Sequence, residues 1–266
     1  MKNKLFLLIA LLAGITFAGN AHTERNNQST ATPENSLIGK WVRIGQAGPV
    51  AFEFKANGMV EGDFGNDQTV DVVTGYELSG DTVKFIDKEG QMCQGYGLYK
   101  VFQTEYYVSF DLIEDECGGR ISTTMGFWTR PEFKDFLKTL DDEISKSPKP
   151  ENYLARARIL LATGMVKQAK EDFDHYLLTD TLDARVYVNR AGTRFPNDLK
   201  GVVSDCDKAI SLDPTQKNAY FLRGLARYEL GEKEQGCEDF SKAIELGFSV
   251  LRIAEEEKCI EYWEKK

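Results

Sequence analysis

Two hydrophobic periods divide the chain. From residue 37 to residue 130, apolar and polar side chains alternate in short runs, and turn residues such as Asn57-Gly58 and Gly80-Asp81 separate the runs. Alternation with a period of two predicts half-buried β-strands, and these turn pairs favour hairpins because Asn and Gly tolerate positive φ. After Pro131, apolar positions recur at helical spacing. The chain therefore changes from strands to helices at this proline.

The alternating segment predicts eight strands, the last of them over residues 120–130 after the glycine pair at 118–119. Short connections force neighbouring strands to be antiparallel, and eight strands are enough to close an up-and-down barrel. A sandwich of two sheets is the alternative. The predicted fold class is α+β with several domains: an antiparallel β-barrel over residues 36–130, then an α-helical domain over residues 131–266.

The two ends of the strand region carry a family signature. Gly39-Lys40-Trp41 opens the first strand, and Trp128-Thr129-Arg130 ends the last one. In this respect the segment resembles the lipocalin-like barrels. The resemblance implies that Arg130 crosses the ring of Trp41 and closes the barrel by a cation–π contact. Because the segment is shorter than a typical ligand-carrying lipocalin, a barrel filled by its own side chains competes with one that holds a small molecule.

The helical region repeats itself about every 34 residues. Small residues recur at Ala157, Ala191 and Gly224, and a second column holds Phe173, Cys206 and Phe240. This pattern resembles the tetratricopeptide repeat (TPR), which implies two antiparallel helices per repeat, with small residues where the helices touch. We expect a solenoid of about three repeats over 151–248, a preceding helix over 133–145 and a closing helix over 249–263.

The first residues resemble an export signal. Lys2 and Lys4 precede a largely apolar run of thirteen residues at 5–17, and small residues follow up to Ala21. This order predicts a signal peptide over 1–21 and a flexible leader over 22–35. The apolar run is shorter than the roughly 20 residues that span a bilayer, so no transmembrane segment is expected in the mature chain. No cysteine lies there for lipid attachment, so we expect a periplasmic or secreted bacterial protein.

Export changes the meaning of the five cysteines, since an oxidising compartment permits disulfides. Cys93 and Cys117 lie beside glycines that allow close backbone approach, and one strand separates them, which favours a bridge. Cys237 and Cys259 lie at nearly equal distances from the turn near residue 247, which favours a second bridge. Cys206 is then the odd thiol, buried in the column that phenylalanine fills elsewhere. Reduced, buried thiols are the alternative for Cys93 and Cys117. For Cys237 and Cys259, the direction in which the two side chains face decides whether the bridge forms.

Composition excludes several function classes. Acidic residues outnumber basic ones by 42 to 33, so no basic field attracts nucleic acid. Only His22 and His175 occur, no glycine-rich phosphate loop precedes a helix, and no Cys/His quartet exists. The sequence therefore predicts no catalytic site, no cofactor and no metal ion.

The leading hypothesis is an exported, non-enzymatic adaptor that binds a peptide or a partner protein. The binding groove is expected on the first helix of each repeat, and its candidate residues are Leu154, Arg158, Leu161, Val188, Phe195, Phe221, Leu225 and Tyr228. The alternative is that several of these side chains pack against neighbouring helices. The alternative function is a lipocalin-like protein that binds a small hydrophobic molecule or lipid, with the repeats as an accessory.

Overall fold

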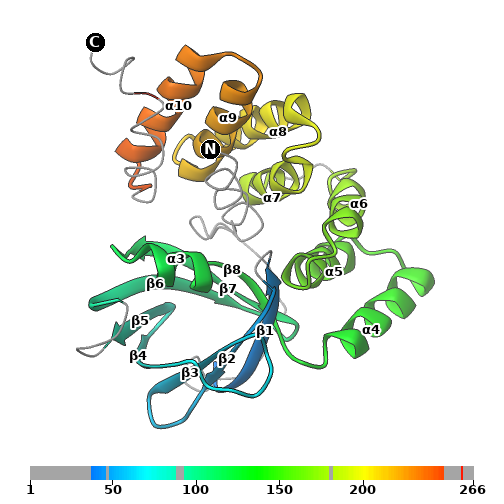
Figure 1. Ribbon diagram of the computed structural model, residues 1–266. Coiled ribbons are helices and arrows are strands. Elements are labelled where there is room, and N and C mark those ends of the chain that lie inside the picture. Colours follow the sequence, from blue (N-terminus) through cyan, green and yellow to red (C-terminus); the bar gives the residue numbers. More distant parts are fainter. Residues whose placement is uncertain (1–36, 46–47, 88–92, 180–181, 249–258, 260–266) are drawn as a thin grey trace. The chain divides into compact units, whose positions relative to one another are not determined.

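The computed structural model describes residues 37–45, 48–87, 93–179, 182–248 and 259. The expected signal peptide, the leader and all of the closing helix except Cys259 lie outside these residues. Eight antiparallel strands form a closed barrel in sequence order (Figure 1). The strands are β1 (Gly39–Gly45), β2 (Gly48–Phe54), β3 (Met59–Phe64), β4 (Val72–Ser79), β5 (Thr82–Asp87), β6 (Gly95–Gln103), β7 (Tyr107–Glu114) and β8 (Gly126–Thr129). The barrel prediction is confirmed.

Aromatic side chains fill the interior of the barrel. The rings of Phe54 on β2 and Phe110 on β7 stack with centroids 6.0 Å apart, although these two strands are not neighbours. Phe85 on β5 lies 6.1 Å from each of these two rings, and the indole of Trp128 on β8 stacks on Phe52 at 4.5 Å. Rings from strands around the whole barrel can meet only inside it, so the interior is a packed core.

The last strand is shorter than the sequence pattern predicts. Residues expected to begin it form the helix α3 (Gly118–Thr124) instead, and β8 begins at Gly126. The prediction was wrong because tertiary contacts override the strand propensity of a Thr- and Ile-rich run. Arg43, buried inside the barrel, donates to the carbonyl oxygens of Thr123 (3.2 Å) and Met125 at the end of α3. This guanidinium satisfies carbonyls that a helix end leaves unpaired, which favours the helix.

A buried ion network holds the other end of α3. Arg120 donates from Nε and Nη2 to the carboxylate of Asp115 at 2.6 and 2.7 Å, and from Nη1 to Asp87. The Tyr99 hydroxyl also donates to Asp115. Gly97 is required beside the network, because a Cβ there would lie 2.1 Å from an Asp115 oxygen.

Seven helices follow the barrel in the described part of the chain (Figure 1). They are α4 (Phe133–Lys146), α5 (Pro150–Ala162), α6 (Val166–Tyr176), α7 (Ala184–Arg194), α8 (Leu199–Leu212), α9 (Lys217–Glu229) and α10 (Lys233–Glu245). The helices α5–α6, α7–α8 and α9–α10 form three hairpins, as the repeat predicts. Small residues bring the helices of a pair together: at Gly224, a Cβ would lie 2.7 Å from the ring of Phe240.

The chain divides into two compact units, Met1–Tyr176 and Leu177–Lys266. This division differs from the change of pattern at Pro131, because α5 lies against strands β1, β7 and β8 within the first unit (Figure 1). The first hairpin of the repeat region therefore belongs to the same compact unit as the barrel.

Both expected disulfides are present. Cys93 is joined to Cys117, and Cys237 on α10 is joined to Cys259. Cys206 is a free, buried thiol, and burial raises its pKa well above the ordinary value. The thiol form is therefore strongly favoured, which makes the sulfur a poor nucleophile.

Arg130 and Trp41 meet where the barrel closes, as the lipocalin resemblance implies. The guanidinium carbon lies 3.6 Å from the centroid of the indole ring. Its Nη1 also donates to the carbonyl oxygens of Ile38 (3.2 Å) and Lys40 (3.3 Å). In the described residues β1 and β8 share one register pair, Val42 with Thr129, so side chains contribute much of this closure.

Candidate functional site

The eight candidate groove residues have different environments. Three of them are half-buried: Leu161, Phe195 and Tyr228. The other five are between 1% and 7% exposed, namely Leu154, Arg158, Val188, Phe221 and Leu225. The sequence predicted an amphipathic face but did not reveal how deeply each position is covered. These five side chains are therefore packed against other residues and do not line an open groove.

Phe221 illustrates the difference. Its ring stacks on Phe248 with centroids 4.6 Å apart and lies 6.2 Å from Phe240. Only 3% of Phe221 is exposed, so this ring stabilises the third hairpin. A partner could reach it only after the hairpin rearranged.

Arg158 and Leu161 on α5 face the outside of the barrel. The Arg158 guanidinium donates to the hydroxyl of Tyr107 on β7. Leu161 packs against the buried cluster that contains Tyr107 and Phe127. The sequence pattern predicted both residues in an open groove. This prediction was wrong, because both side chains contact residues of the barrel.

A repeated ion pair, which the sequence analysis missed, joins the two helices of each hairpin. The arginine at the seventh position of the first helix donates two hydrogen bonds to a buried aspartate of the second helix. The pairs are Arg156–Asp172 (2.8 and 2.6 Å), Arg190–Asp205 (3.0 and 2.6 Å) and Arg223–Asp239 (2.9 and 2.6 Å). The hydrogen bond to Asp172 raises the pKa of Arg156, so this pair stays ionised.

An aromatic ring accompanies each of these arginines. A tyrosine three residues earlier lies under the guanidinium, at 5.7 Å for Tyr153, 5.9 Å for Tyr187 and 5.4 Å for Tyr220. Three columns of the sequence carry this unit. Tyr and Arg step by 34 and then 33 residues, like the small-residue column, and Asp steps by 33 and then 34, like the column of Phe173. Aligning the charged positions along with the apolar ones would have found it.

Two asparagines on the first helices of the second unit each carry a buried amide oxygen to which no described residue donates. Asn189 on α7 and Asn218 on α9 are 3% and 1% exposed, and neither amide oxygen has a hydrogen-bond partner among the described residues. Asn218 precedes Phe221 and Leu225 by three and seven residues, which places it on their side of α9. A buried amide oxygen without a partner is destabilising, so such groups mark places where a ligand can supply a donor.

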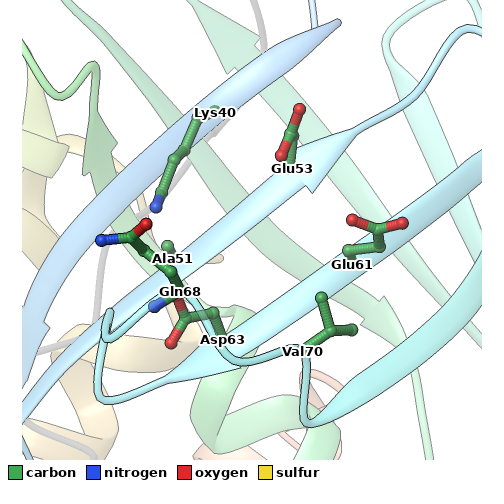
Figure 2. Close-up of a pocket in the computed structure, with 7 residues that line it drawn as sticks. All are labelled: Lys40, Ala51, Glu53, Glu61, Asp63, Gln68 and Val70. Carbon is green, nitrogen blue, oxygen red and sulfur yellow. The ribbon is translucent and has the colours of Figure 1, made fainter.

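A hollow on the surface of the barrel is too small and too polar to hold a lipid. It measures about 230 Å³ and is lined by Lys40, Ala51, Glu53, Glu61, Asp63, Gln68 and Val70 (Figure 2). Lys40, Ala51 and Glu53 alternate along β1 and β2 with the inward-facing Trp41, Phe52 and Phe54, so the hollow lies on the outside of the barrel. Glu53 and Glu61 are both paired with Lys55, at 2.8 and 3.2 Å. A shallow, charged surface of this kind lacks the apolar lining that hydrophobic ligands need.

Within the described residues, no group of three or more metal-binding side chains comes together. Over the same part of the chain, no helix combines the length and apolarity needed to cross a membrane.

Residues 218–246, which cover most of α9 and all of α10, match the family described as "Tetratricopeptide repeat". The chain contains a tetratricopeptide repeat. This TPR is the third hairpin, and the ion pair Arg223–Asp239 joins its two helices.

Several solved structures are similar to part of the chain at low identity. "Crystal structure of MamA protein" is 20% identical, covers 50% of this chain and 80% of its own, and has a TM-score of 0.45. "Second TPR of Spaghetti (RPAP3) bound to HSP90 peptide SRMEEVD" is 22% identical, covers 42% and 96%, and has a TM-score of 0.35. "MamA 41-end from Desulfovibrio magneticus RS-1" is 19% identical, covers 44% and 68%, and has a TM-score of 0.41. No curated protein sequence matches the chain.

Proposed function

We propose that the protein is an exported, non-enzymatic adaptor that holds a peptide segment of a partner protein on the first helices of its second and third repeats. The observation that carries this proposal is the pair of buried, unpartnered amide oxygens on α7 and α9. A peptide main chain supplies N–H donors at regular intervals, so it can satisfy both groups once the side chains that cover these 1% and 3% exposed asparagines move apart. The half-buried rings of Phe195, directly after α7, and of Tyr228 on α9 would provide apolar anchors.

The compartment is part of the proposal. Two disulfides join cysteines of this chain, and such bonds persist in oxidising compartments. Together with the signal-like first residues, they support a periplasmic or secreted location.

The test uses peptides selected on the full chain from a phage-displayed random library. We expect Asn189→Leu and Asn218→Leu each to weaken binding of a selected peptide about two- to tenfold, the effect of losing one neutral hydrogen bond. Asn197→Leu is the matched control, because Asn197 is exposed in the turn after α7. Fluorescence anisotropy of the labelled peptide measures the affinity.

The same two variants should not destabilise the free protein. Leucine has the same branched, four-heavy-atom side-chain skeleton as asparagine, although its methyl groups make it larger, and it removes an acceptor that has no partner, so thermal stability should stay equal or rise. A site that is purely structural predicts the opposite sign. Unchanged affinity in both variants, or the absence of any selectable peptide, would overturn the proposal.

A further inference from the structure

Three aromatic rings on the outside of the barrel form a face that receives α5. Tyr107 on β7 and Phe127 on β8 meet edge to face at 5.5 Å, and Phe102 on β6 lies 6.2 Å from Tyr107. Val108 and Trp128 alternate with Tyr107 and Phe127 and point into the barrel, so the three rings point outwards. We call Phe102, Tyr107 and Phe127 the outer aromatic face.

Arg158 of α5 lies at the centre of this face. Its guanidinium carbon is 5.1, 5.7 and 5.9 Å from the ring centroids of Tyr107, Phe127 and Phe102. The side chain is 5% exposed, and its Nε has no hydrogen-bond partner in the described residues. Cation–π attraction is strongest in such a desolvated setting. An arginine held among aromatic rings is typical of the core of a protein–protein interface.

Of the positions that α5 uses, that of Leu161 is half-buried in the other repeats, whereas that of Arg158 is buried at Leu225 in the third repeat. Arg158 aligns with Gly192 and Leu225, at steps of 34 and 33 residues. Leu161 aligns with Phe195 and Tyr228 at the same steps. In the first hairpin, Leu161 and Ala162 pack against the cluster that contains Tyr107 and Phe127. The barrel therefore covers the face of α5 that corresponds to the proposed binding positions of α7 and α9.

We propose that the outer aromatic face occupies the binding positions of the first repeat as an intramolecular partner. It fills the first repeat's binding positions with the chain's own barrel, so that a partner peptide is held by α7 and α9 alone. This inference rests on the proposed function and refines it: the barrel sets where the binding surface begins. The covered face is apolar apart from Arg158, so a competing occupant would need aromatic side chains of its own.

Cysteine labelling tests this proposal in a Cys206→Ala background, which leaves both disulfides in place. Leu161→Cys, Phe195→Cys and Tyr228→Cys each introduce one thiol at the same position of a different repeat. The probe is a peptide selected as described above, and the measurement is the rate of maleimide labelling. With the peptide at ten times its Kd, labelling at positions 195 and 228 should slow about tenfold and labelling at 161 should not change.

A second arm loosens the contact from each side. Phe127→Ala and Arg158→Ala should each speed labelling at position 161 severalfold while leaving position 228 unchanged. Equal protection of 161 and 228 by the peptide would overturn the inference, and so would rates at 161 that neither variant changes. If the peptide protects none of the three positions, the proposed function fails as well. A faster rate at 161 in the two variants would then still show that the barrel covers α5.

Discussion

The repeated Arg–Asp pair allows the same substitution to be compared in two different surroundings. In the first hairpin, Asp172 is 3% exposed at its side chain, and Arg156 is the one cation that the described residues place on it. In the third hairpin, Asp239 accepts from Arg223 and also from Arg227 Nη1 at 2.9 Å. Arg156→Met therefore leaves a buried carboxylate without a cation, whereas Arg223→Met leaves one that is still paired.

The structure implies different costs for the two variants. Removing one partner of a buried ion pair costs about 3–5 kcal/mol, and we expect the lower end for Arg156→Met because Arg156 is 22% exposed. Arg223→Met should cost about 1.5 kcal/mol, the lower end of the value of hydrogen bonds to a charged group, because the second cation remains. Replacing both partners, as in Arg156→Met with Asp172→Leu, should recover most of the loss, since no buried charge is then left.

Urea unfolding followed by far-ultraviolet circular dichroism measures these differences as changes in the midpoint at constant m-value. Met at position 156 keeps most of the aliphatic contact of the arginine, so the comparison isolates the charge. Equal losses in Arg156→Met and Arg223→Met would refute the reasoning, as would a double variant that is no more stable than the single one.

Three further outcomes are expected. Burial and the hydrogen bond to Asp115 raise the pKa of Tyr99, so the native protein keeps this phenol protonated above pH 10. The contribution of the protonated phenol to the free energy of unfolding is present below pH 10 and is lost at higher pH. Ultraviolet titration should show one tyrosine that ionises only on unfolding. Cys206 should resist maleimide in the native protein and react after denaturation; rapid native labelling would contradict its burial. An N-terminal fragment that ends at Arg130 leaves Tyr107 uncovered and should bind a hydrophobic dye, whereas one that ends at Tyr176 should not; equal dye binding would show that α5 is not needed as a cover.

The architecture could be predicted because it depends on local periods. Alternation between Leu37 and Arg130 reports which side chains face a barrel core, and the column of Ala157, Ala191 and Gly224 reports where helices touch. Neighbouring residues in the chain carry this information. The cation–π closure at Trp41 was accessible because a family resemblance supplied it.

What was missed depends on contacts between distant segments. Residues 120–124 have strand propensity, and only the buried partners of Arg120 and the carbonyl contacts of Arg43 make them helical. The helical period placed Arg158 on a definite face of α5, but no period states what covers that face. Likewise, the burial of Phe221 depends on Phe248, which follows α10.

The closure of the barrel has a mechanical consequence. Backbone hydrogen bonds between most neighbouring strands form ladders of four to seven register pairs, whereas β1 and β8 share one pair in the described residues. Arg130, Trp41 and the helix α5 hold this line together from outside the ladder. Under a pulling force, or in a slow spontaneous opening, β1 and β8 should separate first, while the other seven strand pairs keep their backbone hydrogen bonds. The sheet would then be a closed barrel while α5 is attached, and an open sheet with two free edges once α5 detaches.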